Sequence, residues 1–179
     1  NPDEYIERYG ADALRLYLMF TGPYDQGGDF RDSAMEGMSR WVQKVWRMAQ
    51  KSLDKHSPDS SATIKKALHR AIKKVGEDIE RLHYNTAISQ LMILLNAMEK
   101  TNQLPAASYK LFLKLLAPFA PFVSEELWSR FFVGKKSGYK SIHLEKWPGY
   151  DPNKIKEETK IVVVQINGKV REKFSAPYD

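Results

Sequence analysis

Residues 116–128 read Leu-Ala-Pro-Phe-Ala-Pro-Phe-Val-Ser-Glu-Glu-Leu-Trp, and this stretch decides how the second half of the chain folds. Pro118 ends a helix that reaches it, because proline disfavours helical backbone at the preceding residue and has no N–H to donate. Pro121 suits the first turn of a new helix, where that N–H is not needed. The large rings around the break belong to Phe119, Phe122 and Trp128. We therefore expect a sharp corner between two helices, held by packed aromatic side chains.

Apolar side chains recur at helical spacing on both sides of this corner. The clearest stripe is Ile64, Leu68, Ile72, Val75, Ile79 and Leu82. Its steps of three and four place these residues on one face of a helix. The same periodicity predicts helices over residues 33–54, 85–100, 108–116 and 124–132, with shorter ones over 2–9 and 13–20. Asn85 is the expected N-cap of the third long helix. The short connections indicate an all-α, up-and-down helical bundle.

The period of the pattern changes from helical to alternating near the C-terminus. Val162, Val164 and Ile166 alternate with their neighbours, and Asn167-Gly168 follows directly. Asn-Gly favours a two-residue hairpin turn, because a type I′ turn needs positive φ at both central positions. We therefore expect a C-terminal β-hairpin appended to the helical bundle.

Composition excludes several classes of protein. The 179 residues include no cysteine, which excludes disulfides, iron–sulfur ligation and thiol catalysis. No apolar run approaches the roughly 18 residues of a membrane span, so no membrane partner is expected. The formal net charge of +6 is uneven, with −5 in residues 1–39, +7 in 40–110 and +4 in 111–179. A basic middle and end suit a polyanionic partner, although ordinary solubilising charge is the alternative.

One group of cations has a regular spacing. Its members are Arg40, Lys44, Arg47 and Lys51. Steps of four, three and four make them a basic stripe on the helix predicted over 33–54, opposite its apolar face. Such a stripe can neutralise successive phosphates of a nucleic-acid backbone, and a solvated helix face is the alternative. The cluster Lys65, Lys66, Arg70, Lys73 and Lys74 is less regular, and we expect a plain surface there.

Six segments, in chain order, resemble the helical tRNA-binding domain of the class I aminoacyl-tRNA synthetases. They are Tyr9-Gly10-Ala11-Asp12-Ala13-Leu14-Arg15, residues 41–46, residues 78–81 with 84–88, the corner 116–128, residues 141–144 with Trp147-Pro148, and residues 163–171. The last segment is similar to the strand pair that opens the C-terminal domain of bacterial-type leucyl-tRNA synthetases. The chain is therefore identified as resembling the leucyl branch of that family.

The resemblance implies three sections. Residues 1–32 would be a stem-contact-like connector after the catalytic core, 33–150 the tRNA-binding (anticodon-binding) bundle, and 151–179 a linker with the first β-hairpin of a truncated C-terminal domain. It implies a cytoplasmic location, with tRNA(Leu) and the upstream catalytic domain of the same chain as partners. The basic stripe on residues 40–51 is then the expected tRNA contact.

The resemblance also implies an enzyme of which this chain is one part. The full-length parent would be an ATP-dependent leucine–tRNA ligase that uses ATP and Mg. The family's His-Ile-Gly-His and Lys-Met-Ser-Lys-Ser type motifs do not occur here. We therefore expect no catalytic residue, no metal ligand and no cofactor in this fragment, and no activity from it alone.

Two alternatives stay open at this point. One is the same domain of a valyl or isoleucyl enzyme. The predicted hairpin, instead of a coiled coil, and the lack of cysteine disfavour these two. The other is a helical protein-interaction module with no RNA role, which would bind a protein tightly and tRNA not at all.

Overall fold

The computed structural model describes residues 1–23, 25–26, 28–51, 62–101, 104–133, 138–156, 159–166 and 169–177. The α-helices are α1 (Pro2–Tyr9), α2 (Ala11–Phe20), α3 (Asp32–Lys51), α4 (Ala62–Glu80), α5 (Tyr84–Glu99), α6 (Ala106–Leu116) and α7 (Pro121–Phe132). Two 3₁₀ turns follow, η1 (Ile142–Leu144) and η2 (Pro152–Lys154), and then the strands β1 (Thr159–Ile166) and β2 (Lys169–Pro177). The predicted all-α class with a C-terminal hairpin is confirmed.

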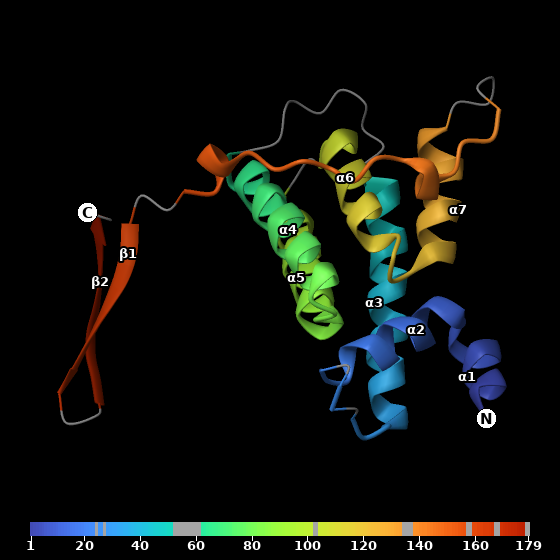
Figure 1. The fold of residues 1–179 in the computed structure, drawn as a ribbon, viewed down its shortest axis with the longest axis horizontal. Helices are drawn as coiled ribbons and strands as arrows, with labels where there is room; N and C mark the ends of the chain where they lie inside the picture. The colour runs from blue at the N-terminus through green and yellow to red at the C-terminus, as the bar shows by residue number, and fades with distance from the viewer. Residues whose placement is uncertain are drawn as a thin grey trace.

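The long helices form a bundle in which α4 and α5 lie side by side as a helical hairpin (Figure 1). Helices α3, α6 and α7 run beside this pair, and α2 crosses the end of the bundle, where it contacts α3, α5 and α7. No helix in the described part of the chain is long and apolar enough to cross a membrane.

The corner between α6 and α7 forms at the predicted residues. Helix α6 ends at Leu116, and α7 begins with Pro121 in its first turn. Phe119 is 1% exposed, but Phe122 is 67% exposed, so the prediction that both rings pack inward is wrong for Phe122. The reason is helical geometry. Phe122 precedes the buried Ser124 by two positions, roughly 200° around the helix, and therefore points away from the core.

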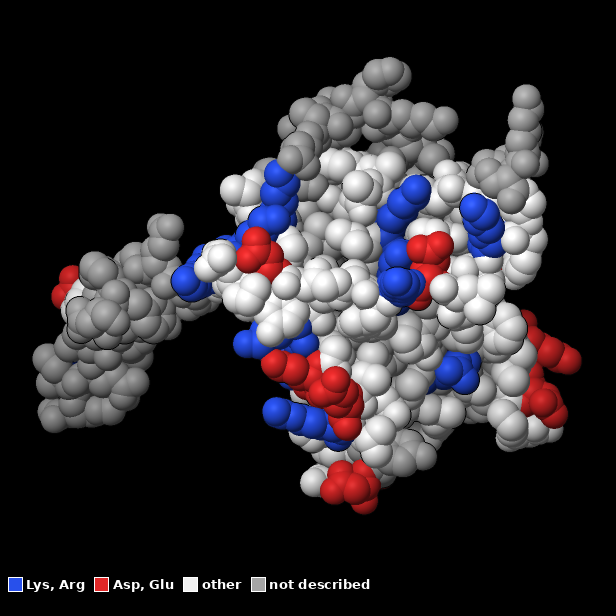
Figure 2. Space-filling model, turned by 45° about the horizontal axis from the view of Figure 1, so that its top comes forward, with Lys and Arg blue, Asp and Glu red and all other residues white. Residues whose placement is uncertain are grey.

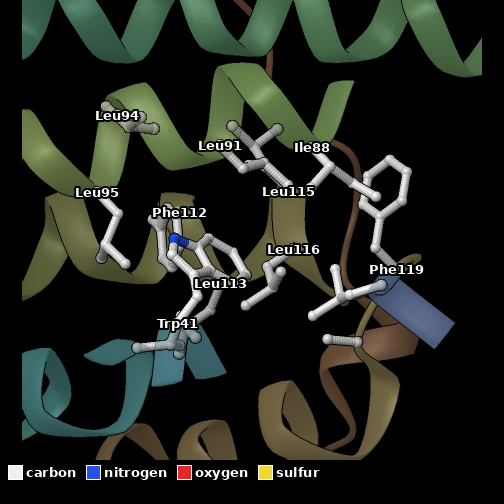
Figure 3. Close-up of a cluster of buried hydrophobic side chains, with 14 of the residues drawn as sticks. Trp41, Ile88, Leu91, Leu94, Leu95, Phe112, Leu113, Leu115, Leu116 and Phe119 are labelled. Carbon is white, nitrogen blue, oxygen red and sulfur yellow. The ribbon is translucent and has the colours of Figure 1, made fainter. Parts of the chain in front are cut away.

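The core lies between α2, α3, α4, α5, α6 and α7, and Figure 3 shows the part of it where α5 and α6 pack against each other and Trp41 of α3 joins them. Its labelled members are Trp41, Ile88, Leu91, Leu94, Leu95, Phe112, Leu113, Leu115, Leu116 and Phe119. Burying each such side chain stabilises the fold by about 1.5–3 kcal/mol. The Tyr109 hydroxyl, also buried, donates a hydrogen bond to the Val45 carbonyl and so joins α6 to α3.

Helix α4 ends at Glu80, before Leu82, the last residue of the predicted apolar stripe. Leu82 adopts φ 59°, and the amides of His83 and Leu82 donate to the carbonyls of Asp78 and Ile79 at 2.7 and 3.1 Å. This pair of bonds is a Schellman motif, with leucine at the left-handed position that glycine usually occupies. Helix α5 then begins at Tyr84 and its N-cap is His83, so the prediction of Asn85 as N-cap is wrong.

An extended segment, residues 139–155, crosses the bundle after α7, and we call it the strap (Figure 1). Three helices hold it. Glu125 of α7 accepts hydrogen bonds from the Ile142 amide at 3.0 Å and from the Ser141 hydroxyl at 2.8 Å. Lys114 of α6 pairs with Glu145 at 2.7 Å, and the Asp151 amide donates to His69 Nδ1 on α4 at 3.0 Å.

The strap leads into the predicted hairpin. Strands β1 and β2 pair antiparallel, from Thr159 opposite Pro177 to Ile166 opposite Lys169. The register shifts between Val164 and Gln165, which leaves one extra residue on β2, as in a β-bulge. The Asn167-Gly168 turn itself lies outside the described residues.

Candidate nucleic-acid interface

The predicted basic stripe consists of Arg40, Lys44, Arg47 and Lys51, and all four residues lie within α3. Their spacing puts them on one side of the helix, as expected for a period of 3.6 residues. The other side carries Val45 and Ala49, which are buried in the core. The backbone of α3 therefore aligns the four cations along the bundle, as the sequence predicts.

Lys44 differs from the other members because it is tied to a neighbouring helix. Its ammonium lies 2.6 Å from the Glu99 carboxylate and donates to Asn96 Oδ1 at 2.7 Å. The side chain is only 19% exposed. Lys44 therefore joins α3 to the end of α5, and Glu99 neutralises much of the charge that it would offer to a phosphate.

Two of the other members face outward. Arg40 is exposed and makes a 3.8 Å ion pair with Glu36 one turn earlier, a type of surface pair that contributes little to stability. Arg47 is exposed, and no ion pair of it is seen within the described residues. The side chain of Lys51 lies outside the described part of the structure. Arg40 and Arg47 are thus the accessible cations of the stripe whose side chains are described.

The two tryptophans of α3 are packed side chains. Trp41 is 9% exposed and belongs to the core (Figure 3). Trp46 is half-buried, and the Arg130 guanidinium of α7 lies 5.3 Å from its ring centroid, over the ring. Trp41 is therefore out of reach of a base, and Arg130 occupies the position over Trp46 that a stacked base would take.

The carboxylates at the start of α7 serve the fold. Glu125 holds the strap, while Glu126 pairs with Arg130 at 3.1 Å. Burial raises the pKa of Glu125, but the hydrogen bonds donated by the strap outweigh it, so that pKa lies below its ordinary value. Within the described residues, no group of three His, Cys, Asp or Glu side chains is arranged to hold a metal ion.

A contact that sequence reasoning missed joins the predicted connector to the α6–α7 corner. The Asp12 carboxylate is 6% exposed and accepts hydrogen bonds from the amides of Val123 at 2.6 Å and Phe122 at 3.4 Å. Arg15 donates to the Pro118 carbonyl at 3.3 Å. Burial raises the pKa of Asp12, and the two amides only partly offset it. The signal in the sequence was an acidic residue in a mostly apolar helix, Ala11–Phe20.

We call these contacts of Asp12 and Arg15 the clasp. They fix the orientation of helix α2 relative to the α6–α7 corner of the bundle. Asp12 occupies the N-terminal end of α7, where the first amides lack partners within the helix and the helix dipole favours negative charge. The α2 helix, the corner and α7 are thereby held as one unit. A ligand bound along the bundle would thus keep a defined orientation relative to residues 1–32.

Comparison with known proteins adds to this geometry. The sequence model of the family "Anticodon-binding domain of tRNA ligase" matches residues 61–178. Curated relatives named leucine–tRNA ligase, from Dehalococcoides mccartyi strains BAV1 and CBDB1, are each 40% identical over 185 residues. The matches cover 98% of this chain and 22% of each relative. The chain thus spans about a fifth of the length of these relatives, and the predicted resemblance to the leucyl branch is confirmed.

A solved structure has the same fold. It is a LeuRS of Agrobacterium radiobacter in a ternary complex with tRNA and LeuAMS. The TM-score is 0.80 at 31% identity, and the match covers 99% of this chain and 25% of that one. The match therefore takes in the helices, the strap and the hairpin together.

Proposed function

Because the chain belongs to the family of anticodon-binding domains of tRNA ligases, we propose that it docks tRNA(Leu) for a leucine–tRNA ligase. The observation that carries this proposal is the match of 99% of the chain to a LeuRS whose structure contains tRNA. The charge of residues 40–110, +7, supports it, since phosphates are the chief source of affinity for nucleic acids. The accessible cations of α3, Arg40 and Arg47, are part of the proposed contact, together with Lys51.

In this proposal the chain contributes to catalysis by orientation. The bundle holds the body of the tRNA, and the clasp at Asp12 keeps it at a fixed angle to the connector, residues 1–32. The acceptor end is thereby presented to a catalytic core in another part of the parent protein. Holding two reactants in a productive geometry lowers the entropic part of the barrier, and this is the whole chemical contribution proposed for these residues.

The remaining elements of the proposal concern the parent. We propose that the parent is an ATP-dependent ligase acting in the cytoplasm, and that its catalytic domain precedes Asn1 and packs on the connector. ATP and Mg would be bound by that domain, because neither nucleotide-binding signature of the family occurs in this chain. The name of the curated relatives supports the leucine specificity.

The test is equilibrium binding of the 179-residue chain to a tRNA(Leu) transcript over a series of salt concentrations. Binding that weakens steeply as salt rises is expected, because released counterions drive it. The matched control replaces the transcript with an acidic protein, which tests whether negative charge alone is enough. Absence of tRNA binding at low salt, with the helical fold intact, would reject the proposal.

A further inference from the structure

Three of the five clustered cations of α4 border a hollow, although the sequence predicts a plain surface there. The hollow has a volume of about 340 Å³. It is lined by Arg70, Lys73, Lys74, Glu77, Gln90 and Ile155. Helix α4 supplies four of these residues, α5 one, and the C-terminal end of the strap one.

The charge of this hollow distinguishes it from a larger one on the same molecule. The larger hollow, of about 490 Å³, lies beside the α4–α5 turn and has both Arg81 and Asp25 in its lining. In the α4 hollow, three of the six lining side chains are cationic and one is acidic. An anion would therefore be attracted to the α4 hollow more strongly than to the larger hollow.

The two lysines of the hollow differ in how tightly they are held. Lys74 pairs closely with Asp78, a carboxylate that is 3% exposed and also accepts a hydrogen bond from Thr86 at 2.8 Å. Lys73 lies 3.9 Å from Glu77, which is a long, half-exposed pair. Lys74 therefore serves the fold, whereas the Lys73 ammonium can turn to a ligand in the hollow at little cost.

Two aromatic rings of the strap lie beside these cations. Tyr150 is 42% exposed, and the Lys73 ammonium lies 6.0 Å from its ring centroid. Trp147 is 43% exposed and packs on α4 at Gly76, where an added Cβ would lie 3.5 Å from the indole nitrogen. The strap anchors at Glu145 and Asp151 flank both rings and hold them against the bundle.

Figure 2 shows how the charges are distributed on this face. Lys and Arg side chains run along the left side, with Asp and Glu side chains beside and below them, and a further group of Asp and Glu side chains lies at the right. The α4 hollow and the N-terminal helix α1 lie on opposite sides of the bundle (Figure 1). Gln90 and Glu99 are nine residues apart on α5, roughly 180° around the helix, so the hollow and the Lys44 contact lie on opposite sides of α5.

We propose that this hollow binds a backbone phosphate of tRNA through Arg70 and Lys73, and that the adjoining unpaired base stacks on Tyr150. The proposal rests on the proposed function and adds a second contact surface, separate from α3. Guanidinium and ammonium groups are the usual phosphate ligands in proteins that bind nucleic acids. Exposed aromatic rings beside them are the usual platform for an unstacked base.

The first test compares two double variants of the 179-residue chain that remove the same charge. Arg70→Gln with Lys73→Gln removes the proposed phosphate ligands, and Arg8→Gln with Arg31→Gln is the control in the acidic N-terminal section. The hollow variant should weaken tRNA(Leu) binding and lower the slope of log affinity against log salt by about one unit for each phosphate that is no longer neutralised. The control should change both much less. Circular dichroism checks that both variants fold.

The second test addresses the stacked base. Tyr150→Ala should weaken binding several-fold and leave the salt slope unchanged, because stacking releases no counterions, whereas Tyr150→Phe should retain the affinity. Equal affinities of the Tyr150→Ala variant and the unsubstituted chain for tRNA would overturn the proposed stacking on Tyr150.

The outcomes separate this inference from the proposed function. If the unsubstituted chain binds tRNA and the hollow variant behaves as the control variant does, the hollow has no RNA role. Only this inference then fails. If inorganic phosphate shifts the NMR signals of α4 while tRNA binding is unaffected by the variants, the hollow is an anion site unrelated to RNA, and the inference again fails. If the unsubstituted chain binds no tRNA, both proposals fail.

Discussion

Asp12 shows how a single buried carboxylate can join two parts of the chain. It lies 111 positions before Val123, whose amide donates to it at 2.6 Å. The sequence shows an acidic residue in a mostly apolar helix but not its partner. The same limit applies to Phe119 and Phe122, which look alike in the sequence and differ in exposure from 1% to 67%. Which of these two rings is buried depends on the start of α7, and that is set by Pro121.

We predict that Asp12→Ala lowers the free energy of unfolding by about 1–3 kcal/mol, because two amides at the start of α7 lose their buried acceptor. Asp12→Asn, which keeps one oxygen, should lose less. Urea denaturation measures both, with Glu126→Ala as a control for an exposed carboxylate. The clasp does not stabilise the fold if both Asp12 variants unfold at the same urea midpoint as the unsubstituted chain.

A second residue-scale prediction concerns pH. His69 Nδ1 accepts the Asp151 amide, which requires the neutral ring, and burial lowers the pKa of His69, with Lys154 adding to the effect. A folded-state pKa below the unfolded value means that the folded chain binds fewer protons. The stability contributed by neutral His69 is therefore present above the unfolded value of about 6.5 and is lost as pH falls through the folded pKa.

The measurement compares the parent with His69→Gln by denaturation between about pH 5 and pH 7.5, a window that spans the ordinary histidine pKa. The difference in unfolding free energy between the unsubstituted chain and the His69→Gln variant should shrink as pH falls. Protonation of His69 breaks its hydrogen bond with the Asp151 amide, and the variant has no such proton to bind. His83→Gln, at the exposed α4–α5 turn, serves as the control. A difference that stays constant with pH would contradict the assignment.

At the scale of elements, α3 combines two roles that its sequence does not separate. Arg40 and Arg47 face solvent, whereas Lys44 joins α3 to α5. We predict that Arg40→Gln, Arg47→Gln and Lys51→Gln together weaken tRNA binding and lower the salt slope by up to about three units, one for each phosphate that these cations neutralise. Lys44→Ala should instead reduce stability. An unchanged slope in the triple variant would identify the stripe as a solvated face.

The helices were predictable because their signal is local. Apolar residues at steps of three and four define α4, α5 and α6 within a few residues of their observed bounds. The hairpin was predictable for the same reason, since alternation and Asn167-Gly168 are neighbours in the chain. The N-cap of α5 was not predictable, because a Schellman motif with Leu82 at the left-handed position has no glycine to mark it.

The binding surfaces were less predictable than the helices. The four cations of α3 share a face, as expected, but the pairing of Lys44 with Glu99 depends on a contact across 55 positions. The α4 hollow depends on the strap, whose anchors to α4 and α6 span 82 and 31 positions. Spacing within one helix cannot reveal such contacts, so the cluster at residues 65–74 looked like an ordinary surface.

At the scale of the whole molecule, we predict that this chain alone does not activate leucine. Neither nucleotide-binding signature of the family occurs in it, and its proposed role is positioning. The measurement is leucine-dependent pyrophosphate exchange with ATP and Mg. The full-length parent should show the exchange, and the 179-residue chain should stay at the level of a reaction without protein. Exchange above that level by the chain would mean that its place in the parent has been misassigned.

The strap has a consequence for the order in which parts of the molecule open. It buries few apolar side chains, Ile142 being its one core member among those described, and three polar contacts hold it to α7, α6 and α4. Segments with few buried contacts open at a lower free energy than a core does. The amides of Ile142 and Asp151 should therefore exchange with solvent deuterium before those of α5 and α6. The strap would then act as a separable layer, released while the helices beneath it remain folded.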